Sequence, residues 1–564
     1  MASLMSYSQP IAPKDSSPRL SAENLQRVSN ISFIRQIQKA LPSTLWLVLL
    51  FSFGCASAKP DQSSAIAAEQ ATPQAMAQSV ATSVERDPNL SERLDSLLSG
   101  PEFTTGRWGI AVMRIKDGRL LYQRNGDKLF TPASNMKVYT TAVALDLLGT
   151  EYRWRTSVYA DAPPDATGNI NGDLILYGRG APDFVSSSIT DNQNSVEALA
   201  QTLVDRGIKH ITGNIVGDES YFRGEPIGEG WQWNDLQWYF GAEASALSIN
   251  GNSVDISITS ATKSSEKPAA VIRDGDNYFQ IVNNLATSDR KSRYRIGVHK
   301  NLSDNNVAVW GEVPIGAQGY GATLSVHNPA LWASRLFMKA ITAKGIRVDG
   351  NAVSRDWRMP ESQRFNPDNK TELAFVTSKS LAEIVKQTNK YSINLYAELI
   401  LRTLGRVRGT AASGSNESQR ERGDEEVGAD LVRSWLGRVG ADARGVAIHD
   451  GSGLSRLNLV TPMMTAQLLL AIQRTGAATA FTDSLPIAGV DGTLQGRLSE
   501  VAAKIRAKTG DLTYDHTLSG YALTPAGNWL AFSIMANDRS GAGTIRLIDQ
   551  LASILVEQPK EPVK

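Results

Sequence analysis

Cysteine and histidine are both scarce in this sequence. One cysteine, Cys55, occurs among 564 residues, and if the chain is cleaved after Ala58 the mature protein has no cysteine, so it needs neither a disulfide nor a thiolate metal site. The five histidines show no HExxH or comparable ligand spacing. We therefore expect no metal ion and no cofactor. The histidines are His210, His299, His327, His449 and His516.

An excess of charge of either sign is also absent. The chain has 58 Lys and Arg against 57 Asp and Glu, so it has no general electrostatic affinity for nucleic acid or for anionic lipid. We expect no nucleic-acid partner. Any partner must be recognised by a local site.

The apolar run near the N-terminus is too short to span a bilayer comfortably. It covers residues 45–54 and is followed by Ala-Ser-Ala ending at Ala58, the small-x-small pattern of signal-peptidase cleavage. This predicts a signal peptide over residues 1–58 and a periplasmic protein. The long charged segment before the run leaves open an uncleaved membrane anchor. Ser52 stands where a lipid-modification box needs a large aliphatic residue, which argues against lipidation of Cys55.

We expect a flexible linker over residues 59–84, with the folded part of the chain beginning after it. Residues 59–84 are rich in Ala, Gln and Ser without a sustained apolar period. Residues 108–127 then alternate as two strands around a Lys-Asp-Gly turn. A helix follows, with Pro132 before its start and Gly149 where a C-terminal cap belongs.

The pattern of apolar and polar residues changes twice in the rest of the chain. Residues 161–371 are short alternating runs broken by Gly, Asn and Pro, which predicts β-rich inserted material. Helical patterns then return, with a helix over Leu395–Leu404 ending at Gly405, and the polar stretch 409–430 is expected to be a mobile loop. The last part predicts strands over 501–510, 518–524 and 528–538 and a helix over 544–557. Early and late strands could share one sheet.

A serine and a lysine, one helical turn apart, lie at the start of the first predicted helix, in the stretch TPASNMKVYTTAVALDLLGT. A serine hydroxyl needs an adjacent base and donors for an oxyanion before it can act as a nucleophile. One helical turn places the Lys137 amine beside the Ser134 hydroxyl. Ser-x-x-Lys alone is a weak pattern, because it recurs at Ser260, Ser264 and Ser288, but only the copy at Ser134 opens an apolar helix after a hairpin.

Two further short motifs follow in order. Ser392-Ile393-Asn394 lies between two helical segments, where its hydroxyl and carboxamide can face one cleft, although the same pattern recurs at residues 248–250 and 303–305. Lys508-Thr509-Gly510 ends a strand, and its glycine should let a substrate approach the backbone.

The three motifs in this order resemble the penicillin-recognising serine enzymes. The long interval between Ser134 and Ser392 requires a large insertion, an arrangement similar to the class C low-molecular-mass penicillin-binding proteins, the D-alanyl-D-alanine carboxypeptidase/endopeptidase family. The resemblance covers about residues 88–558. It implies an α/β (α+β) fold: a β-lactamase/transpeptidase-like domain, an antiparallel sheet flanked by helices, formed by residues 85–160 and 372–564 around the β-rich insertion at 161–371.

The resemblance also implies a role for each motif residue. Ser134 would be the acyl-ester nucleophile, Lys137 its general base and Ser392 a proton relay toward the leaving amine. The substrate, a peptidoglycan stem peptide ending in D-Ala-D-Ala, and β-lactam inhibitors would bind through the remaining positions. Asn394 would hold the substrate amide, Lys508, Thr509 and Gly510 would bind the terminal carboxylate, and the N–H groups of Ser134 and Asp511 would form the oxyanion hole.

Asp511 departs from the family pattern, which usually has Ser or Thr at this position. A carboxylate there should repel the substrate's own carboxylate unless it turns away. Ile393 replaces the commoner Asp of the middle motif, a position to which no chemistry is assigned.

The sequence leaves two other functions to consider. A penicillin-binding cell-wall scaffold with little peptidase turnover is the alternative that Asp511 mildly favours. A classical hydrolase using His449, Asp450 and Ser452 is disfavoured because triad members normally come from separate segments, and a turn built on Gly451 and Gly453 explains this stretch better.

Overall fold

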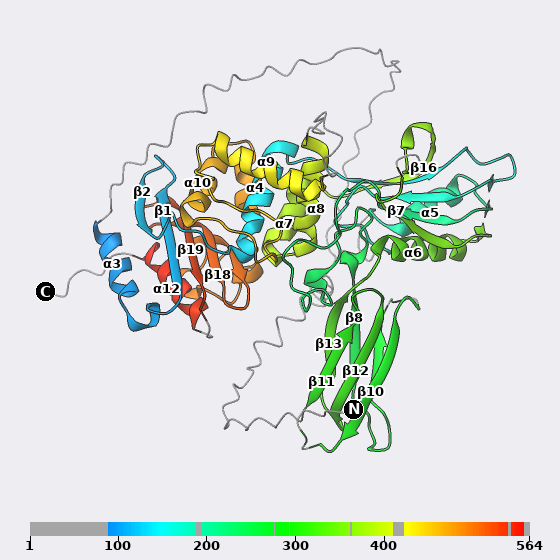
Figure 1. Ribbon diagram of the computed structural model, residues 1–564, viewed down its shortest axis with the longest axis horizontal. Helices are drawn as coiled ribbons and strands as arrows, with labels where there is room; N and C mark the ends of the chain where they lie inside the picture. The colour runs from blue at the N-terminus through cyan, green and yellow to red at the C-terminus, as the bar shows by residue number, and fades with distance from the viewer. Residues whose placement is uncertain are drawn as a thin grey trace, which may run out of the picture.

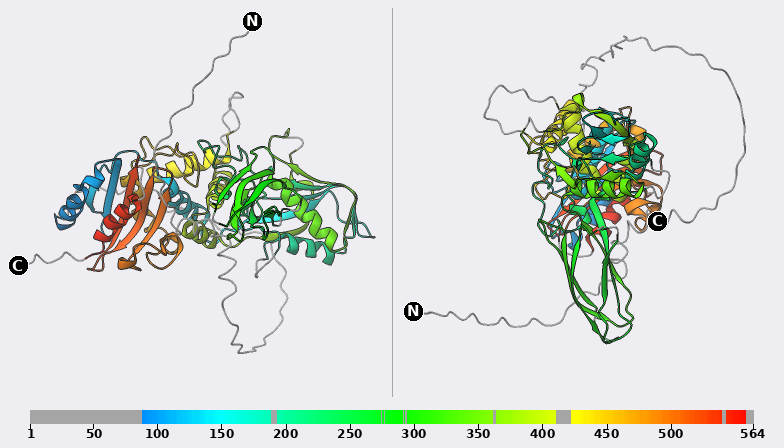
Figure 2. Two further views of the ribbon diagram at one scale, coloured as in Figure 1. Left: turned by 90° about the horizontal axis from the view of Figure 1, so that it is seen from below. Right: turned by 90° about the vertical axis from the view of Figure 1, so that its right-hand side faces the viewer.

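The structure is a computed structural model that describes residues 88–557, except 188–192, 274, 276, 291, 293, 361–363, 410–421 and 540–542. The signal peptide predicted over 1–58 and the linker predicted over 59–84 lie outside the described residues. Two regions lie side by side, one built from both ends of the described chain and one from its middle, and a narrow β-structure projects from the second (Figures 1 and 2).

The first region is built on an antiparallel sheet that combines early and late strands, as predicted. Strand β1 is buried along nearly its whole length and pairs with β19 on one side and with β2 on the other. The order is β17 (Ile505–Asp511), β18 (His516–Leu523), β19 (Trp529–Asn537), β1 (Arg107–Arg114) and β2 (Leu120–Arg124).

Helices cover both faces of this sheet (Figure 1). On one face, apolar side chains of α3 (Pro88–Leu98) and α12 (Thr544–Ile554) pack with the sheet into one buried cluster. The opposite face contacts α10 (Pro462–Ile472), and behind it lie further helices that share the largest core cluster. They are α4 (Met136–Leu148), α7 (Leu381–Tyr391), α8 (Asn394–Arg408), α9 (Asp424–Arg438) and α11 (Ala478–Ser484).

The predicted hairpin, first helix, late strands and final helix are all present, but α8 and the stretch after it differ from expectation. Gly405 does not end the helix, which runs on to Arg408. A methyl group at Gly405 would overlap the Asp424 carbonyl oxygen, so this glycine allows α8 and α9 to approach closely. The described part of the predicted loop 409–430 is helical from Asp424, because Val432 and Trp435 farther along α9 are buried in the core.

The middle region contains a mixed five-stranded sheet. Strands β3 and β16, which bracket the predicted insertion, pair antiparallel with each other, while β5, β7 and β15 run parallel. Helices α5 (Val196–Asp205) and α6 (Pro329–Ala343), which the sequence analysis did not anticipate, pack beside it. The sheet order is β15 (Ala352–Arg355), β7 (Ile215–Asp218), β5 (Leu174–Tyr177), β3 (Arg155–Ala160) and β16 (Thr371–Thr377). A small sheet has the order β14 (Arg347–Val348), β6 (His210–Ile211), β4 (Asn169–Ile170).

Two three-stranded sheets form the projecting part of the insertion (Figure 1). The chain enters through β8 and leaves through β13, which are hydrogen-bonded neighbours. One sheet has the order β13 (Tyr320–Ser325), β8 (Ser253–Thr259), β9 (Ala269–Ile272), and the other β10 (Gln280–Ser288), β12 (Asn306–Pro314), β11 (Arg295–Lys300).

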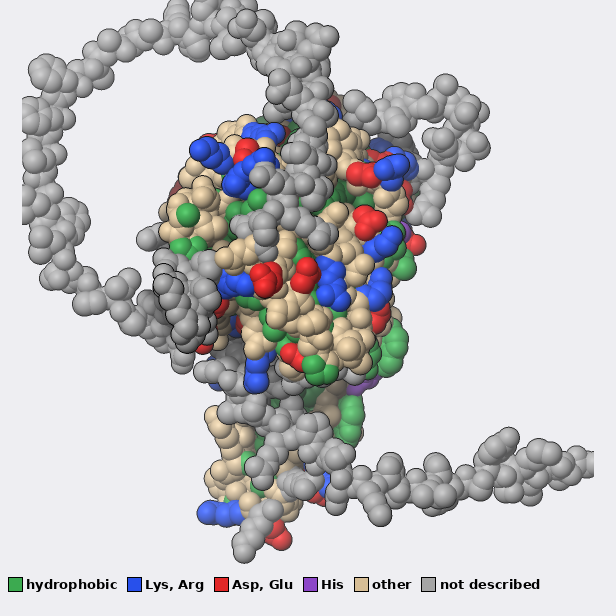
Figure 3. Space-filling view, turned by 90° about the vertical axis from the view of Figure 1, so that its left-hand side faces the viewer, with side chains coloured by type: hydrophobic (Ala, Val, Ile, Leu, Met, Phe, Trp, Pro, Cys, Tyr) green, Lys and Arg blue, Asp and Glu red, His purple; other side chains and the backbone are tan. Residues whose placement is uncertain are grey.

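The surface on the side of α3 and α12 carries both signs of charge interspersed (Figure 3). Pairs such as Arg93–Glu557 at 3.1 Å and Arg497–Asp549 at 2.6 Å lie in this part of the molecule. This mixture agrees with the balanced composition. In the part of the chain that the structure describes, no helix is both apolar enough and long enough to cross a bilayer.

Candidate active site

Ser134 lies in a tight turn that opens α4. It is the middle residue of the 3-10 turn η3 (Ala133–Asn135), and Ala133 before it has a left-handed φ of 47°. A methyl group at Gly453 would overlap the Ala133 carbonyl oxygen, so the turn is packed directly on that glycine. The Asn135 side chain donates to the carbonyl oxygen of Lys508 at 3.2 Å. The turn is therefore fixed to the strand that carries the third motif.

The Lys137 amine is the centre of the site. Its Nζ donates to Ser134 Oγ at 2.9 Å, to Asn394 Oδ1 at 2.7 Å and to the carbonyl oxygen of Ser452 at 2.7 Å. Lys137 has no exposed surface. Burial lowers the pKa of its amine to about 7, against the opposing effects of Asp450 and Glu398. A large fraction of free base is therefore available near neutral pH.

Two buried carboxylates hold the loop that touches Lys137. Glu398 on α8 accepts from the N–H groups of Gly451 and Ser452, the latter at 2.8 Å. Asp450 accepts from the Gly453 N–H at 2.8 Å. Burial, and next the charge of Asp450, raise the pKa of Glu398 to about 7. These contacts place the Ser452 carbonyl oxygen where it meets the lysine.

Asn394, the first residue of α8, is fixed by both regions of the molecule. Its Nδ2 donates to the carbonyl oxygen of Phe240, in the inserted segment, at 2.9 Å. This bond orients the carboxamide so that Oδ1 faces Lys137. The insertion thus reaches the edge of the site through a backbone group. Among the described residues, no hydrogen bond joins an inserted side chain to Ser134.

Ser392 ends α7 in a left-handed backbone conformation, with φ 57° and ψ 40°. A non-glycine residue in this region is strained by about 1 kcal/mol or more, and such strain is maintained by the surrounding structure. The conformation points the hydroxyl at the third motif, where Ser392 Oγ accepts from Lys508 Nζ at 2.9 Å. The hydrogen bond from Lys137 to Asn394 brings this motif beside that of Ser134, across the long interval that predicted an insertion.

The third motif lies on β17, the edge strand of the sheet. Lys508 Nζ also donates to the Thr509 carbonyl oxygen at 2.8 Å, and burial, with the nearby Lys137 second, lowers its pKa well below the usual value. The approach of a substrate to the Gly510 backbone stays a prediction, and the structure gives this glycine a packing role as well. A methyl group there would lie 2.8 Å from the Pro132 carbonyl oxygen, so the missing side chain makes room for the Ser134 turn.

Asp511 follows Gly510 and is about half exposed. Its Oδ1 lies 2.7 Å from Nδ1 of His516, the residue opposite it on β18. The carboxylate therefore contacts the histidine ring of the neighbouring strand.

The three motifs thus form one site, with both lysines fully buried and Ser134, Ser392, Asn394 and Thr509 reaching its partly exposed surface. The alternative triad is not assembled. His449 Nδ1 lies 2.8 Å from Glu229 Oε2, and the Ser452 side chain is fully buried. Among the described residues, no group of three or more His, Cys, Asp and Glu side chains is suited to hold a metal ion.

Besides the loop of Asp450 and Ser452, for which only a turn was predicted, three contributors to the site were missed from the sequence: Glu398, the Phe240 carbonyl group and Thr493, whose hydroxyl meets that of Thr509 at 2.8 Å. Glu398 had a detectable signal, because a lone acid interrupts the apolar run of its helix. The other two depend on long-range contacts that leave no local pattern.

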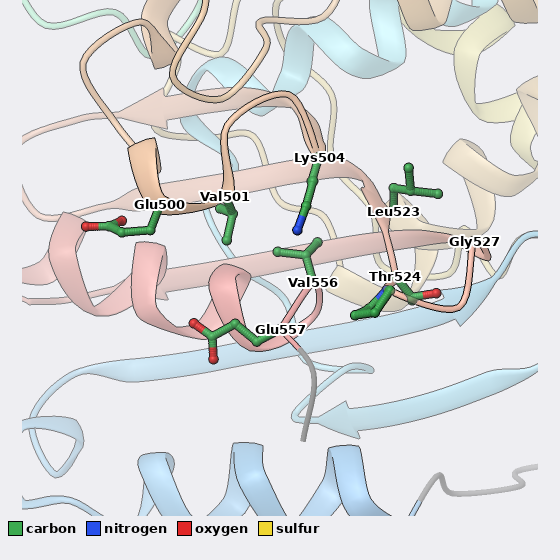
Figure 4. A pocket seen from close by; sticks show the side chains of 9 residues that line it. Glu500, Val501, Lys504, Leu523, Thr524, Gly527, Val556 and Glu557 are labelled. Carbon is green, nitrogen blue, oxygen red and sulfur yellow. The ribbon is translucent and has the colours of Figure 1, made fainter. Parts of the chain in front are cut away.

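A separate hollow of about 680 Å³ lies between the end of α12 and the β18–β19 turn (Figure 4). Val501, Lys504, Leu523 and Val556 are among its lining residues. None of the three motifs contributes to it, so it is not part of the candidate active site.

Comparison with known proteins gives consistent relatives. The chain is 32% identical over 484 residues to a D-alanyl-D-alanine carboxypeptidase from Actinomadura sp., covering 83% of this chain and 84% of the relative. It is 26% identical over 437 residues to the D-alanyl-D-alanine carboxypeptidase DacB of Haemophilus influenzae, covering 77% and 85%.

Solved structures show the same fold. Penicillin binding protein 4 (dacB) from Haemophilus influenzae superposes with a TM-score of 0.69 and 24% identity, over 82% of this chain and 99% of the other. A second structure of that protein, in complex with a β-lactam, has a TM-score of 0.65 and 22% identity over 82% of this chain and 100% of the other.

The family model of the D-Ala-D-Ala carboxypeptidase 3 (S13) family matches residues 90–558. This match covers the three motifs and both parts of the sheet. The chain therefore belongs to the D-Ala-D-Ala carboxypeptidase 3 (S13) family and is a serine-type hydrolase.

Proposed function

We propose that the protein cleaves the D-Ala–D-Ala bond of peptidoglycan stem peptides through an acyl-enzyme at Ser134, and that β-lactams acylate the same hydroxyl. One observation carries the proposal: Lys137 Nζ lies 2.9 Å from Ser134 Oγ and has a pKa of about 7. The protonated amine donates across this contact, and once it has lost that proton its lone pair can accept the proton of the Ser134 hydroxyl, which is the activation that this nucleophile needs.

Acylation begins when Ser134 Oγ attacks the carbonyl carbon of the penultimate D-Ala and Lys137 takes the hydroxyl proton. The backbone N–H groups of Ser134 and Asp511 hold the oxyanion. As the C–N bond breaks, the proton held by Lys137 passes through the Ser392 hydroxyl to the leaving amine of the terminal D-Ala, which returns Lys137 to the free base and Ser392 to the hydroxyl. Water then hydrolyses the Ser134 ester, which restores the hydroxyl and releases the shortened peptide.

Substrate binding uses the remaining polar groups. Asn394 bonds the peptide amide, and Lys508 and Thr509 bind the terminal carboxylate. An arriving carboxylate favours the charged form of Lys508, whose pKa burial lowers in the free enzyme. A β-lactam supplies the same carboxylate. Its leaving nitrogen stays attached to the acyl group, which explains why the ester would persist.

The test is covalent labelling. A labelled penicillin should attach to Ser134, and a Ser134→Ala protein should take up no label. Ser260→Ala is the matched control, because Ser260 also precedes a lysine by three residues and its hydroxyl is bound to the Ala317 carbonyl oxygen. Label at the wild-type level on Ser134→Ala would refute the proposal.

The scaffold alternative differs only in turnover. Mass spectrometry of purified cell-wall fragments incubated with the protein should show loss of terminal D-Ala. Labelling without any release of D-Ala, or any cut of a D,D cross-link, would instead support the scaffold.

We also propose that the protein is exported to the periplasm and cleaved after Ala58. The support is the pattern of residues 45–58, which lie outside the described residues. N-terminal sequencing of the exported protein should begin near Lys59, and recovery of Met1 would contradict cleavage.

A further inference from the structure

The turn at residues 490–493 connects the second motif to the third. The 3-10 turn η8 (Gly492–Leu494) lies against both α7 and β17. The Asp491 carboxylate accepts from Lys390 Nζ at 2.6 and 2.7 Å, and Lys390 stands two residues before Ser392 with its side chain only 7% exposed. The turn is thus tied to the end of the helix that carries Ser392.

The same turn is also fixed by the residue that follows Thr493. Leu494 is fully buried in the core cluster on the α12 side of the sheet. Its carbonyl oxygen accepts from the N–H groups of Gly489 and Arg497, each at 3.0 Å. Buried apolar contact and closed backbone bonds leave the turn little freedom.

Thr493 presents its hydroxyl from this rigid turn to Thr509. The Oγ1 atoms are 2.8 Å apart, with Thr509 donating to Thr493. The Thr509 carbonyl oxygen accepts from Lys508. A threonine hydroxyl has one hydrogen, so Thr509 cannot donate to Thr493 and to an arriving carboxylate together.

We propose that Thr493 is a positioning residue for recognition of ligands with a free terminal carboxylate. In the free enzyme its hydroxyl accepts from Thr509. When a carboxylate binds, Thr509 turns its hydrogen to the ligand and Thr493 becomes the donor, so that a chain runs from Thr493 through Thr509 to the carboxylate. A hydrogen bond to a charged acceptor is strengthened by such a chain. The inference rests on the proposed function, in which Thr509 binds the carboxylate.

The experiment compares two ligands on matched variants. Thr493→Val removes the hydroxyl and keeps the shape, Thr493→Ser keeps the hydroxyl, and Thr388→Val removes a buried hydroxyl on α7 that bonds only to a helix carbonyl oxygen. Acylation rates are measured with labelled penicillin and with its methyl ester, which lacks the carboxylate. Thr493→Val should slow penicillin by roughly fivefold and the ester by less than about twofold. Thr493→Ser and Thr388→Val should leave the ratio of the two acylation rates as it is in the wild-type protein.

A double variant shows whether the effect passes through Thr509. In a Thr509→Val background, Thr493→Val should cause no further loss with penicillin, because the shared interaction is already gone. Equal losses with both ligands, or additive losses in the double variant, would overturn the inference.

A binding measurement separates this inference from the proposed function. Affinities of the Ser134→Ala protein for a peptide ending in D-Ala-D-Ala and for its C-terminal amide need no acylation. Thr493→Val should weaken the free acid by roughly fivefold and leave the amide unchanged. If Thr493→Val leaves the affinity for the acid and for the amide unchanged, the role of Thr493 is overturned, even if penicillin labels Ser134. If Thr493→Val weakens only the acid but penicillin does not label Ser134, the acyl-enzyme is refuted and the role of Thr493 stands.

Discussion

Lys137 makes the reaction depend on pH in a defined direction. Its pKa of about 7 means that the free base forms as pH rises, so acylation by saturating penicillin, whose bound carboxylate keeps Lys508 charged, should increase between about pH 6 and about pH 8 and then level off. Lys137→Arg keeps a charge at all these values and should lower the acylation rate by roughly a thousandfold. A flat profile over this range would exclude Lys137 as the base.

Glu398 provides a control for that profile. While it is ionised, Glu398 favours the protonated form of Lys137, so Glu398→Gln should shift the acid limb to lower pH; because the pKa of Glu398 is itself about 7, the shift should be no more than roughly half a unit. The glutamine can still accept from the Ser452 N–H. A shift to higher pH would show that the limb does not report Lys137.

Asp511 should reduce activity through its charge. We expect Asp511→Thr to raise peptidase turnover and penicillin acylation by up to about fivefold, the equivalent of ~1 kcal/mol. The gain should be larger in a His516→Gln background, because the contact between His516 Nδ1 and the carboxylate, at 2.7 Å, is then lost. Steady-state kinetics of the four proteins tests this. No gain in either background would mean that the side chain makes a helpful contact.

Helix packing gives a paired prediction at the next scale. Gly405→Ala should destabilise the fold by about 2 kcal/mol, because the added methyl group overlaps the Asp424 carbonyl oxygen between α8 and α9. Gly437→Ala, in α9 with no atom within 4 Å of the added methyl group, should instead stabilise by about 0.5 kcal/mol. Thermal unfolding compares them. Equal effects would contradict the close approach of these helices.

These two helices also show what the sequence could and could not predict. The hairpin, α4 and the late strands were predictable because each follows a local period and its own turn signal. The predicted end of α8 was wrong because, in the sequence, a glycine that permits close helix packing cannot be distinguished from a glycine that caps a helix. The start of α9 was missed because its first turn is acidic, and its apolar residues come later.

The site divides in the same way. The serine and lysine motifs could be recognised from residue types in order, and the family predicted from them is confirmed. Glu398, the Phe240 carbonyl group and Thr493 act through contacts between distant segments. The packing role of Gly510 could not be predicted, because only the fold shows that the Ser134 turn occupies the space beside it.

At the scale of the molecule, Arg402 joins the two regions. It is 2% exposed, with Nη1 2.7 Å from Glu425 of α9 and Nη2 donating to the Glu225 carbonyl oxygen of the insertion at 2.6 Å. Arg402→Met leaves Glu425 buried without its partner and should cost about 3 kcal/mol. Arg358→Ala is the control, because this exposed arginine pairs with the Glu225 side chain and should cost less than about 1 kcal/mol. Equal losses on thermal unfolding would contradict a buried junction.

The central sheet has a further consequence, which concerns the order of folding during synthesis. β1 cannot be flanked on both sides until β19 exists, and the Thr131 N–H bonds to an Asn537 side chain 406 residues away. Such distant pairings form late and slowly. The nascent chain therefore carries its serine and lysine for most of its synthesis without the strand that completes the site, and a chain released before Ile505 would have no acylating activity. The hydrolase can therefore become active only after its last strands have been synthesised.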